Sequence, residues 1–412
     1  MNTSEQRSST ERSARIDEAL ISAVRRGRLA RLREQMIVRD IGAVVLVDPV
    51  NVRYATDTRN MQIFCARNPA RYAFIAADGP VVVFEFAGCA HLASGLETVD
   101  EVRIARTASY VSAGEGLEGI TRAWADEIAD LVKRHCGGNR RVGLERFNAA
   151  AAFALLGHGL EIVDAQEPVE RARAIKVPGE IALLQASMDM VEEGVARLRD
   201  ALEPGISENR LWSMLWSHVI ESGGDYIETR LLASGARTNP WFQECSERVI
   251  EAGDMVCLDT DVVGCHGYYA DMSRSFVCGD VGPSAAQREL YALAFEQIQH
   301  NLALMRPGAT FAEVSERGWR IPARYHAHRY YLLAHGIGMT GEYPYILYHD
   351  DYRTGGYDGV IEPDMVLCVE SFIGAEDGGE GVKLEQQIHI TETGYELMSQ
   401  FPFEEALLGR EV

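Results

Sequence analysis

The sequence predicts an α+β protein of two domains, residues 1–168 and 169–412. Its 412 residues exceed what a single hydrophobic core usually supports. The composition, 47% hydrophobic and 25% charged, is that of a globular protein. Helical stretches and β-rich apolar runs follow one another without the regular βαβ alternation of a parallel sheet. The order of elements therefore favours an α+β layout.

The first half reads as a small α/β domain. Two apolar, β-rich runs joined by Ala-Asp-Gly predict a hairpin over 71–86. Helices are expected over 10–39, which is rich in Arg, Leu and Ala, and over 115–135. Buried strands are expected at 43–49, where the run ends in a turn, and at 141–145.

A charged, proline-containing stretch over 167–181 leads into the second half of the chain. A long amphipathic helix is expected directly after it, over 179–202. Beyond residue 225, apolar β-rich runs are punctuated by Gly and Pro, and helices are expected over 284–305 and 310–320. The second half is thus a second α+β domain.

Charge and composition exclude several classes of partner. The net charge of −21 disfavours non-specific binding to nucleic acid or to an anionic membrane. No apolar run approaches the roughly 18 residues needed to span a bilayer. Residues 1–20 have no apolar core of the kind found in secretory signals. The eight cysteines are scattered without a CxxC pair, which predicts a reducing compartment, the cytoplasm.

Residues 257–276, CLDTDVVGCHGYYADMSRSF, place three aspartates in an apolar stretch that should form buried strands. They are Asp259, Asp261 and Asp271. Burying an ionised carboxylate costs several kcal/mol unless a partner compensates it. Three later apolar runs carry the same anomaly, and their ionisable residues are His335, Glu370 and Glu385. A single buried ionisable residue with a partner is common in protein cores, but six would need six partners. The main cationic residues in the neighbouring sequence are Arg274 and Lys383.

A pair of divalent metal ions would satisfy all six residues at once. Carboxylate oxygens suit hard cations such as Mn²⁺, Fe²⁺ or Mg²⁺, and an imidazole adds preference for a transition metal. The absence of CxxC and HExxH patterns excludes the commonest zinc sites. Bridging carboxylates would hold two ions about 3.5–4 Å apart. The residues therefore predict a pair of divalent metal ions.

The metal-motif residues resemble a known superfamily. GYYADMSRSF, AHGIGM, VLCVES and VKLEQQIHIT follow one another as the metal motifs do in creatinase, prolidase and aminopeptidase P, and ARAIKVPGEIALLQAS (172–187) resembles that superfamily's entry into its catalytic domain. The resemblance covers about residues 10–405. It implies a small N-terminal α/β domain, a pseudo-twofold pita-bread catalytic domain and a homodimer. The ligands it implies are Asp259 and/or Asp261, Asp271, His335, Glu370 and Glu385.

The sequence departs from the peptidases where they contact peptide. The position eleven residues before Asp271, where the resemblance places the first metal aspartate, is Thr260, and this implies an insertion. The loop 234–250 carries no histidine, and Tyr331 and Glu342 replace two further histidines. Those imidazoles bind and protonate a peptide amide, so ordinary dipeptidase activity is not expected.

The segments in which the sequence departs from the peptidases resemble dimethylsulfoniopropionate lyases of the DddP type. IETRLLASGARTNPWFQEC, CLDTD and DPVNVRYATDTRNMQ all read like that branch. Its members use an iron-type site to release dimethyl sulfide and acrylate. The resemblance therefore implies a small zwitterionic substrate and two divalent transition-metal ions, iron first, with manganese or zinc as alternatives. Aromatic rings bind sulfonium cations at about 0.5–2 kcal/mol each. The aromatic residues expected at the substrate are Trp241, Phe242, Tyr330 and Tyr331.

The base for such a lyase is left open by the sequence. The resemblance places an acidic base directly before a Glu-aromatic-Pro segment, and here that position is Gly341. Glycine cannot carry a proton. Three other residues are candidates for the catalytic role: Tyr330, Glu342 and Asp377.

Three functions remain open on this reading. The first is a metal-dependent carbon–sulfur lyase acting by β-elimination on dimethylsulfoniopropionate or a similar zwitterion. The second is a metal-dependent C–N hydrolase, similar to an Xaa-Pro dipeptidase, on a small zwitterion. The third is a non-enzymatic binding protein, which would leave the complete metal set unexplained.

Overall fold

The computed structural model describes residues 16–409, which form two compact units by their internal contacts. The N-terminal unit comprises Asp17–Arg173 with Val177–Gly179, and the C-terminal unit comprises Ala174–Lys176 with the chain from Glu180 onward. Most of the segment assessed for a secretory signal, and the beginning of the predicted 10–39 helix, lie outside the described residues. No helix in the described part of the chain has both the length and the apolar character to cross a bilayer.

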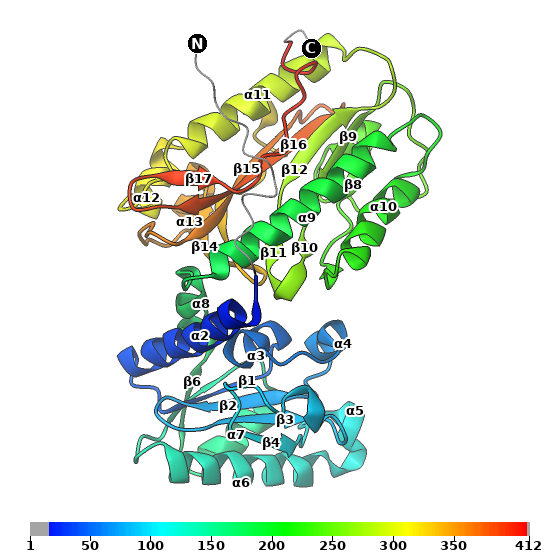
Figure 1. Cartoon of the computed structure of the whole chain (residues 1–412). Helices are drawn as coiled ribbons and strands as arrows, with labels where there is room; N and C mark the ends of the chain where they lie inside the picture. Colours follow the sequence, from blue (N-terminus) through cyan, green and yellow to red (C-terminus); the bar gives the residue numbers. More distant parts are fainter. Residues whose placement is uncertain (1–15, 410–412) are drawn as a thin grey trace. The chain divides into compact units, whose positions relative to one another are not determined.

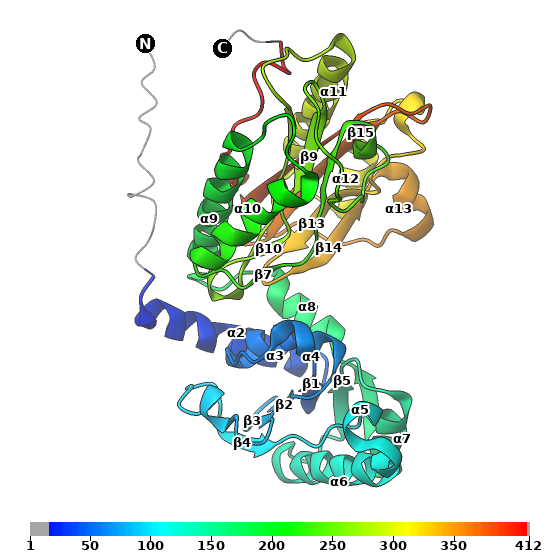
Figure 2. The same ribbon diagram turned by 90° about the vertical axis from the view of Figure 1, so that its right-hand side faces the viewer.

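The N-terminal unit is built on a six-stranded mixed sheet in the order β4-β3-β2-β1-β5-β6. The predicted hairpin is confirmed, since β2 and β3 pair antiparallel. Helices α2 and α3 lie on one face of the sheet, and α6 and α7 lie on the other (Figure 1, Figure 2). The strands are β1 (Ala43–Leu46), β2 (Tyr72–Ala76), β3 (Val81–Glu85), β4 (Glu101–Ile104), β5 (Arg141–Leu144) and β6 (Glu161–Asp164). The helices are α2 (Glu18–Val38), α3 (Pro49–Thr56), α4 (Gln62–Arg67), α5 (Tyr110–Ala113), α6 (Leu117–His135), α7 (Ala149–Gly157) and α8 (Gln166–Ala174).

One boundary in this unit differs from the prediction. The run 43–49 does not end in a turn; Pro49 instead begins helix α3. Proline is favoured at the first helical position because its fixed φ suits the helix and its missing N–H would have no partner there. Asp48 caps that helix by accepting a hydrogen bond from the Val50 N–H.

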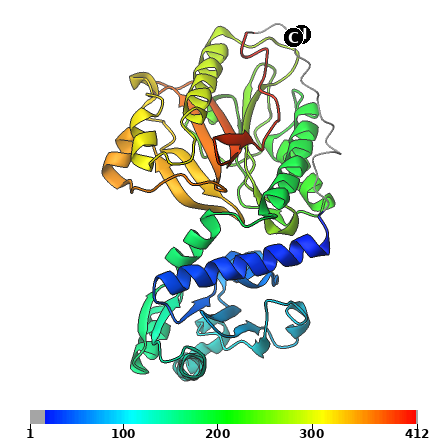
Figure 3. The same ribbon diagram turned by 60° about the vertical axis from the view of Figure 1, so that its left-hand side comes forward.

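The C-terminal unit has two halves, and each combines helices with a set of strands. Figure 3 shows the helices of the first half in green and those of the second half in yellow to orange, on opposite sides of the strands. This is the pita-bread arrangement that the resemblance implies. The helices are α9 (Glu180–Asp200), α10 (Glu208–Glu221), α11 (Ala285–Leu302), α12 (Phe311–Arg317) and α13 (His349–Gly355).

The strands of this unit form three sheets, in the orders β11-β10-β7, β12-β9-β8 and β14-β13-β15-β16-β17. Strands β12 and β9 lie beside β16, so the two halves meet along these strands. The first-half strands are β7 (Tyr226–Ile227), β8 (Leu232–Ser234), β9 (Met255–Asp259), β10 (Val262–Val263), β11 (Tyr269–Ala270) and β12 (Ser273–Val277). The second-half strands are β13 (Leu332–Ile337), β14 (Gly341–Leu347), β15 (Val366–Gly374), β16 (Gly381–Ile390) and β17 (Tyr395–Leu397).

Strand alternation separates the apolar core from the ionisable residues. On β15 and β16, Val369 and Leu384 pack in one apolar cluster with Tyr291 and Ile298 of α11. The neighbouring residues on these strands point to the opposite face, because successive side chains of a strand alternate. That opposite face carries Glu370 and Glu385.

Candidate metal centre and substrate cavity

The first half of the C-terminal unit contributes three aspartates, Asp259, Asp261 and Asp271, which lie close together. Asp259 ends strand β9 and is paired in register with Ser273 of β12. Asp261 follows with a φ of +44°, a left-handed conformation that Asp tolerates better than most residues. Carboxylate oxygens of Asp259, Asp261 and Asp271 all lie within 4.8 Å of one another. The two alternatives left open by the sequence, Asp259 and Asp261, are therefore both at the site.

Thr260, between them, has a different role. Its hydroxyl donates to the Ala270 carbonyl over 3.2 Å and accepts from the Met272 N–H over 3.0 Å. These bonds link the residue after β9 to the main chain of residues 270–272. The spacing of eleven residues before Asp271 thus falls on a threonine that stabilises the strands.

Asp261 and Asp271 are fixed by further hydrogen bonds. The carboxylate of Asp261 accepts from the Tyr269 hydroxyl over 2.9 Å and from the Thr229 hydroxyl. Its N–H donates to a carboxylate oxygen of Asp271 over 3.2 Å. The N–H of Asp271 donates to Oε1 of Gln387 over 3.1 Å. Both carboxylates are thereby oriented before any ligand binds.

The second half contributes a histidine and two glutamates. Glu370 and Glu385 are directly opposite each other on β15 and β16. Nε2 of His335, on β13, lies 3.4 Å from Oε1 of Glu370 and 3.7 Å from Oε1 of Glu385. Its Nδ1 lies 3.0 Å from the Gly336 carbonyl. Donation of the Nδ1 proton to that carbonyl would leave Nε2 as the nitrogen that binds a metal.

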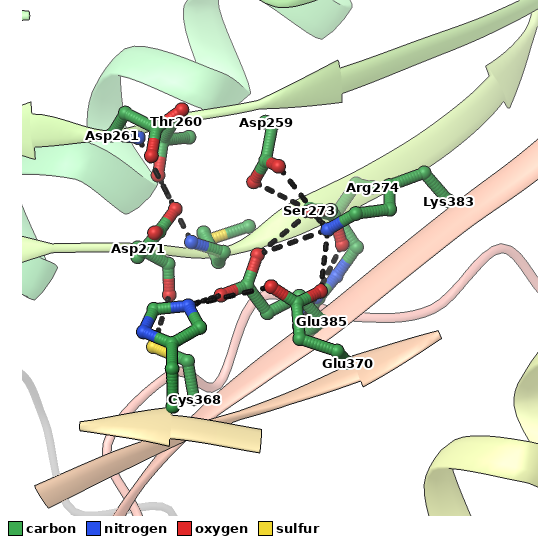
Figure 4. Close-up of polar contacts among 12 residues, drawn as sticks. Asp259, Thr260, Asp261, Asp271, Ser273, Arg274, Cys368, Glu370, Lys383 and Glu385 are labelled. Carbon is green, nitrogen blue, oxygen red and sulfur yellow. Dashed lines mark hydrogen bonds and ion pairs between the residues drawn. The ribbon is translucent and has the colours of Figure 1, made fainter. Parts of the chain in front are cut away.

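Lys383 lies among the same carboxylates (Figure 4). It is two residues before Glu385 on β16 and is fully buried. Its Nζ is 3.1 Å from Asp259, 2.6 Å from Glu370 and 3.3 Å from Glu385, in each case to a carboxylate oxygen. Nζ also donates to the Ser273 hydroxyl over 2.7 Å. One ammonium group therefore supplies part of the positive charge that the buried acids require.

The donor set fits two divalent cations. Two groups of potential ligand atoms share Asp271, which is the arrangement a bridging carboxylate needs. Oε1 of Glu385 is buried and accepts no hydrogen bond from the described residues. Five carboxylates less one ammonium leave four negative charges, the charge of two divalent ions. The groups are Asp259 with Asp261 and Asp271, and Asp271 with His335, Cys368 and Glu385.

The pKa shifts within the cluster also indicate a site for cations. Burial and the neighbouring acids, Asp261 first, raise the pKa of Asp271 well above its ordinary value. Burial also raises the pKa of Asp259 to about 6, against the opposing effect of Lys383. Burial alone would lower the pKa of His335, but the neighbouring carboxylates of Glu370 and Glu385 raise it well above its ordinary value. A divalent ion would compete with the proton that the raised pKa of Asp271 favours.

A cavity of about 400 Å³ opens onto the cluster. Asp259, Asp261, Asp271, His335 and Glu370 line its floor. Aromatic rings line its wall, and three of them are residues the sequence predicts at the substrate or in catalysis: Phe242, Tyr330 and Tyr331. The Tyr330 ring centre is 5.4 Å from that of Phe242 and 5.5 Å from that of Tyr331. The rings thus form a continuous aromatic wall beside the acids.

Three residues that the sequence predicts at the site do not line this cavity. Trp241 is buried, and its ring centre lies 6.0 Å from that of Phe372 and 5.8 Å from Nζ of Lys383. Glu342 is buried in an ion pair with Lys176, with 2.6 Å between Oε1 and Nζ. The Asp377 side chain is 76% exposed and lies 3.9 Å from Arg324. The cavity lining contains none of the three.

Sequence reasoning missed several residues at the site. Lys383 was noted only as a nearby cation, although its spacing of two from Glu385 places both on one strand face. Cys368 likewise precedes Glu370 by two residues on β15, so the same argument would have placed these two side chains on one strand face. Glu228, Glu244, Tyr269 and Tyr345 also line the cavity. They come from loops and short strands distant in sequence, where no periodic signal marks them.

Comparison with known families agrees with this geometry. The model of metallopeptidase family M24 matches residues 182–392, which contain every residue of the metal cluster. The chain belongs to this family. The creatinase/prolidase N-terminal domain model matches residues 28–175. M24 enzymes are dinuclear divalent-metal enzymes, in keeping with the two ligand groups.

Among M24 proteins, this chain is similar to two lyases over nearly its whole length. It is 39% identical to a "Dimethylsulfoniopropionate lyase DddP" of Roseovarius nubinhibens over 95% of this chain and 89% of the relative. A protein of the same description from Roseobacter denitrificans is 36% identical over 97% and 90%. The fold also matches an Xaa-Pro dipeptidase from Bacillus anthracis, with a TM-score of 0.71 and 22% identity over 92% of this chain and 98% of that one.

Proposed function

We propose that this M24 protein is a metal-dependent lyase that cleaves dimethylsulfoniopropionate, or a closely similar zwitterion, into dimethyl sulfide and acrylate. The observation that carries the proposal is the 39% and 36% identity with two proteins described as such lyases, over 95% and 97% of this chain. The cavity supports the same reading, because an aromatic wall faces a cluster of acids.

The substrate has two charged ends, and the cavity has a complement for each. A sulfonium accepts no hydrogen bond, so aromatic faces are suitable partners, at about 0.5–2 kcal/mol each. Phe242, Tyr330 and Tyr331 provide such faces, and Tyr345 adds a fourth ring near His335. Divalent ions held by the six acidic and histidine ligands would bind the substrate carboxylate and stabilise negative charge that develops beside it.

The residues suit elimination better than hydrolysis. Peptide hydrolysis requires an acid that protonates the leaving amine, whereas dimethyl sulfide leaves as a neutral molecule and needs no proton. Tyr331 in the cavity lining stands where the resemblance places a peptidase histidine. Elimination requires one base for the α-proton and no attacking water.

We further propose an iron-type metal pair, a homodimer and a cytoplasmic location for this enzyme. All eight cysteines are free, which accords with a reducing compartment. The ligand set of oxygens with one imidazole suits iron or manganese. Metal content of freshly purified protein and its mass by light scattering would test the first two points.

The second candidate is a C–N hydrolase similar to an Xaa-Pro dipeptidase, favoured by family membership and by the fold of such enzymes. One experiment separates the two. Purified protein reconstituted with Fe²⁺, Mn²⁺ or Zn²⁺ is incubated with dimethylsulfoniopropionate, and dimethyl sulfide is measured by gas chromatography. The same preparations are given an Xaa-Pro dipeptide. We expect dimethyl sulfide and negligible dipeptide cleavage; the reverse result would establish the hydrolase.

A further inference from the structure

Of the three base candidates from the sequence, Tyr330 alone lines the cavity. Glu342 is engaged with Lys176 and, like Asp377, lies outside the cavity lining. Tyr330 does line the cavity, but burial, followed by the charge of Glu370, raises the pKa of its phenol. A phenol that holds its proton more tightly is less available as a base.

The cavity offers two carboxylates beyond the metal cluster. Its described lining contains Glu228 and Glu244 in addition to the acids already assigned to metal. Both side chains are exposed, and the main-chain carbonyl of Glu244 accepts a hydrogen bond from Arg237. The main-chain N–H of Glu228 donates to the main-chain carbonyl of Asp261 over 2.9 Å. Of the two, Glu228 is therefore the one whose main chain is hydrogen-bonded to a residue of the metal cluster.

Thr340 positions the Glu228 carboxylate. The Thr340 hydroxyl lies 3.3 Å from Oε2 and 3.5 Å from Oε1 of Glu228. Thr340 directly precedes Gly341, which also lines the cavity. The Glu228 carboxylate therefore lies beside the position at which the resemblance places an acidic base.

Gly341 leaves space at that position. A Cβ built on Gly341 would meet no atom within 4 Å. Its φ is outside the left-handed range, so a side chain could be added without backbone strain. A carboxylate at residue 341 is thus absent because of the sequence and not because the fold excludes it.

We propose that Glu228 is the catalytic base, an assignment that rests on the proposed lyase function. A carboxylate oxygen of Glu228 takes the proton from the carbon next to the substrate carboxylate. The electrons of the broken C–H bond form the double bond of acrylate. The carbon–sulfur bond breaks, and its electron pair remains on sulfur as neutral dimethyl sulfide. The proton on Glu228 then passes to solvent.

The first test compares Glu228→Gln with Glu244→Gln in metal-loaded protein. Loss of a general base reduces kcat by about 10²- to 10⁴-fold with little change in KM. We expect that result for Glu228→Gln, with metal content equal to that of wild type. A role in binding the sulfonium would instead raise KM, and this outcome would overturn the proposal. A large kcat loss in Glu244→Gln alone would transfer the role to Glu244.

The second test uses a readout that does not need carbon–sulfur cleavage. The probe is 3-(trimethylammonio)propanoate, whose α-hydrogens can exchange with D₂O while its amine leaves poorly. Wild type should catalyse this exchange, followed by proton NMR, and Glu228→Gln should slow it about 100-fold or more. Exchange at the wild-type rate in Glu228→Gln would overturn the role of Glu228.

The third test is rescue from the neighbouring position. Gly341→Asp in the Glu228→Gln background restores a carboxylate to the open space, and we expect recovery of at least about tenfold in kcat. Gly341→Ala in the same background is the matched control and should restore nothing. Equal recovery with both substitutions, or with neither, would count against a base at this point of the cavity. Wild-type protein that releases no dimethyl sulfide with any metal would overturn the lyase function itself.

Discussion

Nζ of Lys383 lies 2.6 Å from Oε2 of Glu370, and neither side chain has appreciable solvent exposure. The same Nζ contacts Asp259 and Glu385, so one lysine neutralises part of the acid cluster. Burial alone would lower the pKa of this lysine, but Asp259, Glu370 and Glu385 raise it well above its ordinary value. A charged lysine and a pair of divalent ions would therefore stabilise the same carboxylates.

Replacement of Lys383 by methionine should destabilise the metal-free protein much more than the metal-loaded protein. Removing one partner of a buried ion pair costs about 3–5 kcal/mol, because the remaining charges lose their compensation. Bound cations would supply that compensation, so Mn²⁺ should recover most of the loss. Thermal unfolding with EDTA and with Mn²⁺ measures both values. Lys133→Met, at an exposed helix position, is the control. An equal loss of stability in both forms would refute this account.

The two metal-ligand groups predict different stoichiometries for two aspartate variants. Asp271 belongs to both groups, whereas Asp261 belongs to one. Asp271→Asn should therefore lose both ions, and Asp261→Asn should keep one. Inductively coupled plasma mass spectrometry after dialysis gives the number of ions per chain. Two ions in Asp271→Asn, with normal folding by circular dichroism, would exclude a bridging role for Asp271.

The aromatic wall should select for positive charge. Phe242→Leu is expected to weaken binding of 3-(trimethylammonio)propanoate by roughly 3- to 30-fold, the range of a lost cation–π contact. Binding of 4,4-dimethylpentanoate, an isostere that lacks the positive charge, should change much less, because only apolar contact is lost. Inhibition constants for the pair measure the difference. Trp241→Leu, a change in the core beside Phe372, should affect both ligands alike. Equal effects of Phe242→Leu on the two ligands would show that the ring is packing surface only.

Glu145 should make the stability of the N-terminal unit depend on pH. Burial, with a contribution from Asp48, raises its pKa to about 7 despite hydrogen bonds from Val47, Asp48 and Asn51. Between pH 4.5 and 7 the folded unit then binds more protons than the unfolded chain, so stability falls as pH rises through that window. The full effect is on the order of 3 kcal/mol.

Glu145→Gln should remove this pH dependence, whatever its effect on absolute stability. Hydrogen-exchange protection of β1 and β2, corrected for intrinsic exchange rates at each pH, reports the stability of this unit. Glu118→Gln, at an exposed position of α6, is the matched control and should keep the wild-type slope. An unchanged slope in Glu145→Gln would mean that another group is responsible.

The sequence by itself determined the fold class and six of the ionisable residues that gather at the candidate metal centre, although not Cys368. Ionisable residues inside apolar strands can be recognised from the sequence, because a buried charge requires compensation wherever the strand lies in the fold. Asp259, Asp261, Asp271, His335, Glu370 and Glu385 could all be named for that reason, and the structure brings them together. The order of their motifs also gave the family, which the match over residues 182–392 confirms.

Only the tertiary structure decided which other side chains share the cavity. Trp241 and Phe242 are adjacent in sequence, yet one packs in the core and the other lines the cavity. Glu342 appeared available until its buried partner Lys176, far away in the chain, was visible. Glu228 lacked any local signal, since a polar residue in a loop looks the same whether it faces solvent or substrate. An ionisable residue in an apolar strand can be recognised from the local sequence, because the strand will be buried wherever it packs. The direction of a loop side chain, in contrast, depends on contacts that form only when distant segments meet.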